Sequence, residues 1–155
     1  LSANGLLSEP TLYVSLHFKQ NRQTYYNLLQ EVRETGKWEA WLEFFLEAIM
    51  VSANQATETI VKINNLFQDD MQQLDCLGRA KPGCEKALNH MKKLPKLTVP
   101  ALVVEAGITA PTARSALNRL VSLGIIKEVS GKKRDKIYVY KNYLDILTDG
   151  AEPVY

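Results

Sequence analysis

Hydrophobic residues recur every three or four positions through the first half of the chain, which is the spacing of amphipathic helices. The longest such run extends from Trp38 to Leu74 and predicts one long helix. An unbroken helix of this run measures about 55 Å. We therefore expect it to project beyond its packing partners or to be broken once, and a projecting apolar stripe favours pairing with a second copy.

Two shorter helices are predicted before this run. The first is opened by Ser8-Glu9-Pro10, a capping residue followed by an acidic residue and a first-turn proline, and it ends near Gln20. The second has Asn21 as its N-cap and ends at Gly36. The apolar residues predicted to be core in this half are Leu12, Trp41, Phe45 and Ile49.

The second half alternates short helical patterns with short extended ones. Glycine and capping threonines separate them, as at Gly107 and Thr109. The first predicted element is a helix over 84–94 with Ala87, Leu88 and Met91 on one face. An extended piece over 97–99 follows, with Thr98 as the cap of a helix over 100–106. The next helix spans 110–123 and ends at Gly124, and strands are predicted over 125–129 and 136–140.

Two helices joined by a glycine-containing turn form a helix-turn-helix pattern, and here a hairpin with the basic tip Ser130–Asp135 follows. This order of elements predicts a winged helix-turn-helix domain over residues 80–155. Residues 1–79 form the helical region before it, so the predicted fold class is mainly α with a small β-hairpin.

Charge divides the chain at the same place. Residues 1–79 contain six Lys/Arg against ten Asp/Glu, a net charge of −4, and residues 80–155 contain thirteen against seven, a net charge of +6. A basic helix-turn-helix half favours double-stranded DNA as a partner, because cations at the duplex surface release condensed counterions. The candidate DNA contacts are Thr109, Thr112, Arg114, Ser115, Asn118, Lys132, Lys133 and Arg134. A basic hairpin can also be only a solvated loop, and winged helices also dock proteins.

Other chemistry is thinly represented. Cys76 and Cys84 lack the spacing and the histidines of a zinc site, and we expect two free thiols in the cytoplasm. Glu39, Glu43 and Glu47 alternate with core positions of a helix, so a solvated face is favoured over acid–base work. No run reaches the roughly 20 apolar residues that span a bilayer, and we expect no membrane partner.

The run GLLSEPTLYVSLHFKQNRQTYYNLLQEVRETGKWEAWLEFFLEAI resembles the segment that follows the catalytic motif in bacterial Fic-family proteins. Many of these proteins carry a winged helix at the C-terminal end, as predicted here, so the similarity covers nearly the whole chain. Its most specific parts are Leu6–Pro10, Tyr13–Leu16, Asn21-Arg22, Tyr25-Tyr26 and Trp38–Leu42.

The resemblance implies a parent protein that transfers AMP from ATP to a hydroxyl of a target protein, with Mg²⁺ as cofactor. The family's His-Pro-Phe motif and its Gly-Asn-Gly-Arg loop are absent here, since His17 precedes Phe18-Lys19 and His90 precedes Met91-Lys92. The chain therefore resembles the C-terminal piece of a longer protein. We expect it to have no catalytic residues, no cofactor and no enzymatic activity of its own.

The resemblance also implies a remnant nucleotide site. In the family, the helix matching Tyr25–Leu29 forms one wall of the adenine pocket, so Tyr25, Tyr26 and Leu29 would line it and Arg33 would lie at its rim. Tyr25, Tyr26 and Leu29 can equally be ordinary core residues. Without the helices that cover this wall, its apolar side chains favour self-association.

Two functions remain for the chain: DNA binding by the winged helix, or protein docking and homodimerisation through the winged helix and the long helix. Retained catalysis is a third hypothesis and the least favoured, because the chain lacks the family's catalytic motif.

Overall fold

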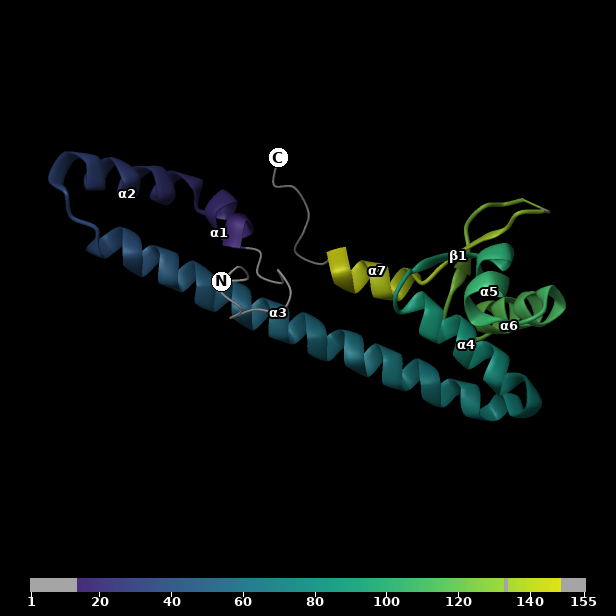
Figure 1. The fold of residues 1–155 in the computed structure, drawn as a ribbon. Coiled ribbons are helices and arrows are strands. Elements are labelled where there is room, and N and C mark those ends of the chain that lie inside the picture. Colours follow the sequence, from purple (N-terminus) through teal and green to yellow (C-terminus); the bar gives the residue numbers. More distant parts are fainter. Residues whose placement is uncertain (1–13, 133, 149–155) are drawn as a thin grey trace. The chain divides into compact units, whose positions relative to one another are not determined.

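A computed structural model describes residues 14–132 and 134–148. This part of the chain is mainly helical with one small antiparallel sheet (Figure 1), as predicted. Its internal contacts separate an N-terminal unit, which ends at Val61, from a C-terminal unit that begins at Lys62. The domain limit predicted at residue 79 falls inside the second unit, which includes the last turns of the long helix.

The N-terminal unit is formed by α1 (Val14–Gln20), α2 (Arg22–Thr35) and the first part of α3 (Glu39–Gln73). Gly36 ends α2 with a φ of 72°, and its N–H donates to the Val32 carbonyl at 2.8 Å, as its C-cap position predicts. The predicted start of α1 at Ser8-Glu9-Pro10 and the predicted core residue Leu12 lie outside the described residues.

Asn21 precedes α2 as predicted, but its side chain does not cap that helix. Its Nδ2 instead donates to the His17 carbonyl at 3.0 Å. The reason is that only one residue separates α1 from α2, so the last carbonyls of α1 lie within reach of the amide. The side chain therefore closes the helix before it rather than opening the next one.

Helix α3 is a single helix of 35 residues, without the break that the sequence left open. Its buried positions differ from the predicted ones: Phe44 and Ala48 are buried, whereas Trp41, Phe45 and Ile49 are only half-buried. Phe44 packs against the rings of His17 and Phe18 at centroid distances of 5.4 and 5.7 Å. The apolar stripe of α3 is broad, so the sequence does not show which of its residues lie at the buried centre. The packing of α1 against α3 buries the side that carries Phe44.

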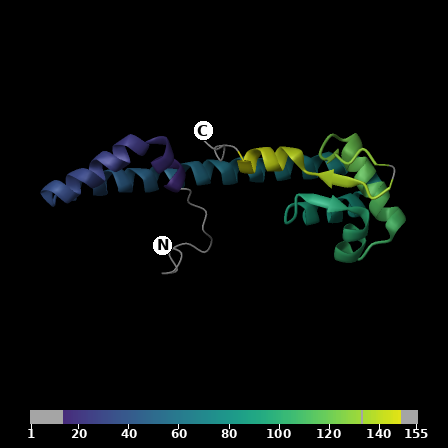
Figure 2. The same cartoon turned by 90° about the horizontal axis from the view of Figure 1, so that it is seen from above.

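The C-terminal unit follows the predicted order of helices and strands as far as β3, and the helix α7 after it was not predicted. After a 3₁₀ turn over Leu74–Ala80, its elements are α4 (Lys81–Met91), β1 (Lys96–Thr98), α5 (Val99–Ala106), α6 (Ala110–Ser122), β2 (Lys127–Glu128), β3 (Ile137–Val139) and α7 (Lys141–Thr148). Helix α4 starts three residues before the predicted position, and the two hairpin strands are shorter than predicted. Figure 2 shows β3 leading directly into α7.

The three strands pair in the order β1-β3-β2, and both pairs are antiparallel. Tyr138 at the centre of β3 lies opposite Leu97 of β1 and Glu128 of β2. Tyr138 and Leu97 face the core, which the helices complete. Its fully buried helical residues include Ala87, Leu88 and Met91 of α4, as predicted, with Leu102 of α5 and Ala113, Leu117 and Leu120 of α6.

Threonine caps and a left-handed glycine shape the link between α5 and α6. Thr98 accepts from the Ala101 N–H and Thr109 accepts from the Thr112 N–H, so both predicted caps are confirmed. Gly107 has a φ of 60°, a conformation that costs other residues energy. Ile108 then packs against the core as the apolar plug of the turn.

A buried polar contact ties the end of α3 into this core. The Tyr140 hydroxyl donates to the Asp70 carboxylate, and both side chains are buried. Burial raises the pKa of Asp70, an effect that the hydrogen bond from Tyr140 opposes, and burial likewise raises the pKa of Tyr140. Among the described residues, no helix is long and apolar enough to cross a bilayer.

Candidate nucleic-acid interface

Helix α6 separates its residues cleanly into a buried and an exposed face. Ala113, Ala116, Leu117 and Leu120 pack into the core, so the helix cannot rotate without unpacking them. Arg114, Ser115 and Asn118 consequently lie on the exposed face. These three residues are the helix contacts that the sequence predicts for DNA.

The first turn of α6 holds two further predicted contacts, Thr109 and Thr112, and both are exposed. Their hydroxyls hydrogen-bond to each other at 2.8 Å, and Thr109 Oγ1 also accepts from the Thr112 N–H at 3.4 Å. The hydroxyl of Thr109 is therefore already used to cap the helix. Thr112 retains hydrogen-bonding capacity at the positive end of the helix dipole.

A shallow depression runs along the exposed face of α6. Its lining residues are Pro111, Arg114, Ser115, Asn118, Arg119 and Ser122. A second depression lies where the start of α4 meets the start of α6, and it adds Arg79 beside Thr112 and Ser115. The sequence reasoning did not name Arg79 or Arg119. Arg119 was detectable because it follows Ser115 by four residues on the same face, whereas Arg79 comes close only through the packing of α4 on α6.

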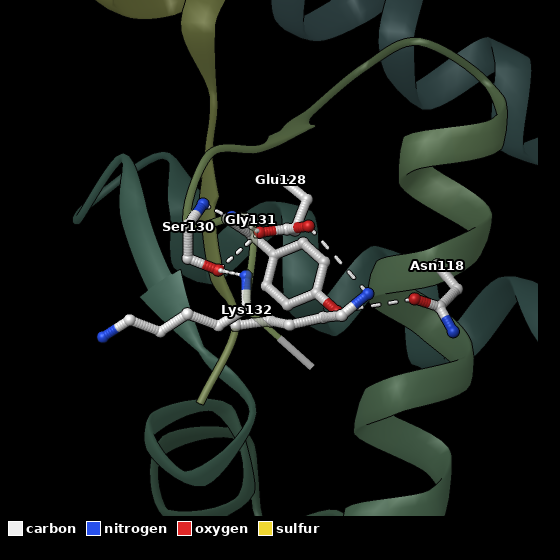
Figure 3. Close-up of polar contacts among 7 residues, drawn as sticks. Asn118, Glu128, Ser130, Gly131 and Lys132 are labelled. Atoms are coloured by element: carbon white, nitrogen blue, oxygen red, sulfur yellow. Dashed lines mark hydrogen bonds and ion pairs between the residues drawn. The ribbon is translucent and has the colours of Figure 1, made fainter. Parts of the chain in front are cut away.

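The tip of the β2-β3 hairpin is organised by one carboxylate, which the sequence reasoning also missed. Glu128 Oε1 accepts from the Ser130 N–H at 2.8 Å, the Ser130 hydroxyl at 2.5 Å and the Gly131 N–H at 3.0 Å. Its other oxygen, Oε2, lies 3.9 Å from Lys136 Nζ. Among the contacts that lower the pKa of Glu128, the hydrogen bond from the Ser130 hydroxyl has the largest effect. This lower pKa favours the ionised carboxylate. Figure 3 shows this arrangement.

The basic side chains of the tip point to solvent. Lys132 and Arg134 are exposed, and Lys133 lies outside the described residues. Neither Lys132 nor Arg134 forms an ion pair with a residue in the described ranges, and the same holds for Arg114 and Arg119. These four cations are therefore available to an anionic partner without first breaking an internal pair.

Tyr138 joins the hairpin to α6. Its hydroxyl donates to Asn118 Oδ1 at 3.4 Å (Figure 3). Burial raises the pKa of Tyr138, the nearby charge of Glu128 raises it further, and Arg114 opposes the rise. Through this hydrogen bond the sheet that carries the hairpin contacts α6, and Glu128 lies opposite Tyr138 in that sheet.

The residues predicted to form a nucleotide wall lie on one side of α2. Tyr25 is half-buried and stacks on Phe18 at 5.1 Å, and Leu29 is half-buried one turn later. Tyr26 is 53% exposed, with the Arg22 guanidinium 5.6 Å from its ring centre, and Arg33 is exposed. The wall is therefore partly packed on α1 and partly open to solvent.

In the part of the chain that the structure describes, no three His, Cys, Asp or Glu side chains are grouped so that they could hold a metal ion. Glu39, Glu43 and Glu47 are exposed, and Cys76 and Cys84 are free thiols. No protein-family model matches the chain.

Proposed function

We propose that the C-terminal unit is a winged helix that binds double-stranded DNA, with α6 entering the major groove. Support comes from the order α4-β1-α5-α6-β2-β3 and from the antiparallel sheet that brings β1 beside β3. The N-terminal end of such a helix is the part that reaches base edges. Thr112, Arg114 and Ser115 occupy that end.

The observation that carries this proposal is the set of unpaired cations on the exposed face of α6 and on the hairpin tip. Arg114 and Arg119 on α6 and Lys132 and Arg134 on the tip lack carboxylate partners among the described residues. Cations without internal partners lose no ion pair when they meet phosphate, so their contribution appears as salt-dependent affinity. Arg114 also has the geometry to bind a guanine edge through two hydrogen bonds.

The N-terminal unit is proposed to be the last part of a Fic-type domain, on the strength of the sequence resemblance. In that proposal the chain is the regulatory and binding region of a cytoplasmic protein adenylyltransferase, and ATP and Mg²⁺ belong to the parent protein. Tyr25, Tyr26, Leu29 and Arg33 would then complete the adenine pocket of the parent. Tyr26 and Arg33 are accessible for this role.

Protein docking or homodimerisation is the second candidate, and α3 supplies a specific observation for it. Five large apolar side chains of this helix are about half exposed: Leu42, Leu46, Met50, Ile60 and Val61. These exposed side chains favour a face that packs against another protein surface.

The test of DNA binding is a salt titration of the purified chain with a fluorescently labelled random duplex, followed by anisotropy. We expect affinity to fall steeply as salt rises, and the triple reversal Lys132→Glu, Lys133→Glu and Arg134→Glu to abolish binding. The reversal Lys86→Glu on α4 is the control, and it should leave most of the affinity. A folded wild-type chain that does not bind at about 50 mM salt would contradict the proposal.

The second candidate is tested by light scattering over a range of protein concentrations. Docking through a second copy predicts a mass that rises with concentration, and it predicts that Leu46→Glu removes the rise. A monomer mass at every concentration would argue against homodimerisation.

A further inference from the structure

Glu128 is an acidic residue within a basic hairpin. Its side chain is only 22% exposed, and its carboxylate accepts hydrogen bonds from the backbone of the tip. Long-range electrostatics alone would make such a carboxylate unfavourable for DNA binding, because it repels phosphate and pairs with Lys136. Attraction to DNA therefore does not explain why an acidic residue occupies this position.

The hydrogen bonds of Glu128 give this position a physical cause. One carboxylate oxygen accepts from two successive backbone N–H groups and from the Ser130 hydroxyl. Hydrogen bonds to an ionised acceptor are about twice as strong as neutral ones. Gly131 has a φ of 61°, so the tip turns sharply where these bonds meet. The Lys132 N–H then donates to Ser130 Oγ at 3.4 Å, which extends the anchored segment to the first basic residue.

The same residue also lies next to the link with α6. Glu128 is opposite Tyr138 in the sheet, and Tyr138 donates to Asn118 of α6. The anchored tip is therefore linked to α6 through Tyr138.

We propose that Glu128 is a positioning residue for the DNA surface, which fixes the hairpin tip so that its cations and those of α6 reach one duplex together. This inference rests on the proposed DNA binding. It predicts a result opposite in sign to simple electrostatics, because removing this acidic side chain with its hydrogen bonds should weaken binding although a negative charge is lost. A flexible tip must be ordered when the complex forms, and that ordering costs conformational entropy.

The experiment compares three single variants by anisotropy with the same random duplex. Glu128→Ala removes both the charge and the acceptor, and we expect affinity to fall on the order of tenfold, with a salt slope smaller by about 1 for each phosphate that the tip no longer neutralises. Glu128→Gln removes the charge but keeps an acceptor oxygen, so it should restore most of the affinity. Asp135→Asn is the matched control, because Asp135 is exposed on the same hairpin and has no hydrogen-bond partner among the described residues.

Asp135→Asn should bind as tightly as the wild type or more tightly, because it removes only repulsion. Amide hydrogen exchange of Ser130 and Gly131 in the free protein gives an independent reading, and both amides should lose protection in Glu128→Ala. Circular dichroism confirms that each variant is folded before affinities are compared.

The outcomes separate this inference from the proposed function. If the wild type binds and Glu128→Ala binds equally or more tightly, the positioning role is overturned while DNA binding stands. If Glu128→Gln and Glu128→Ala lose affinity equally, an acceptor oxygen at this position does not support binding, and the inference again fails. If the folded wild type does not bind, the proposed function fails and this inference fails with it.

Discussion

Replacing Tyr140 by Phe tests how the end of α3 is held in the C-terminal unit. The substitution keeps the ring, which packs on Phe67 at 5.9 Å and on Tyr143 at 5.7 Å, and it removes only the hydroxyl that donates to Asp70. A hydrogen bond to a charged group contributes about 1.5–3 kcal/mol. We therefore expect the free energy of unfolding to fall by about 2 kcal/mol at pH 8, which corresponds to about 8–16 °C in the Tm of a unit of this size.

The pH dependence of this effect identifies Asp70 as the partner. Burial raises the pKa of Asp70 in the folded state, so between the unfolded and the folded pKa the folded protein binds more protons and stability falls as pH rises. Tyr140→Phe removes the hydrogen bond that opposes this rise, and the folded pKa moves higher still. The destabilisation should therefore be largest at pH 8. It should be smaller at pH 4, because the raised pKa leaves more of Asp70 protonated in the folded state, and a hydrogen bond between two neutral groups contributes less.

Urea unfolding followed by far-UV circular dichroism measures this difference at both pH values. Both tryptophans, Trp38 and Trp41, lie in the N-terminal unit, so the fluorescence transition reports that unit and should not move. Tyr143→Phe is the matched control, because its hydroxyl has no hydrogen-bond partner among the described residues. An equal destabilisation by Tyr140→Phe at pH 4 and pH 8 would refute the pairing with a titrating Asp70.

Three further predictions concern α6 and its surroundings. Leu117→Ala should cost about 3 kcal/mol because Leu117 is fully buried, whereas Val104→Ala, at a side chain 78% exposed, should change the free energy of unfolding by less than about 0.5 kcal/mol in urea titrations. Thr109→Ala should cost about 1 kcal/mol by removing the N-cap, measured in the same titrations. Arg119→Ala should lower the salt slope of duplex binding by about 1, while Lys86→Ala should leave it unchanged.

Local chemistry accounts for the elements that the sequence predicted well. Gly36 and Gly107 adopt the left-handed conformation after their helices, and Thr98 and Thr109 cap the helices that follow them. Each of these features depends on residues within a few positions in the chain. The alternation of buried and exposed residues on α6 was likewise readable from its spacing, so the exposed positions of Arg114 and Asn118 were predictable.

Features that depend on distant segments were not predictable in this way. Asn21 bonds backwards to α1 because the link between the helices is short, and Phe44 rather than Phe45 is buried because α1 packs on that side of α3. The candidate site shows the same limit. Glu128 looks like one more surface charge in the sequence, and only the turn of the hairpin brings the N–H groups of Ser130 and Gly131 onto its carboxylate.

Hydrophobic spacing and capping act over one or two turns, and they were enough to specify most of the helices up to α6, the caps Thr98 and Thr109, and the apolar faces of the short helices. Three other features depend on the folded chain: β1 pairs with β3, Asp70 meets Tyr140, and Arg79 joins the surface of α6. These contacts join segments that are up to 70 residues apart. Their partners are selected by the packing of a shared core, in which every element must bury its apolar face at once.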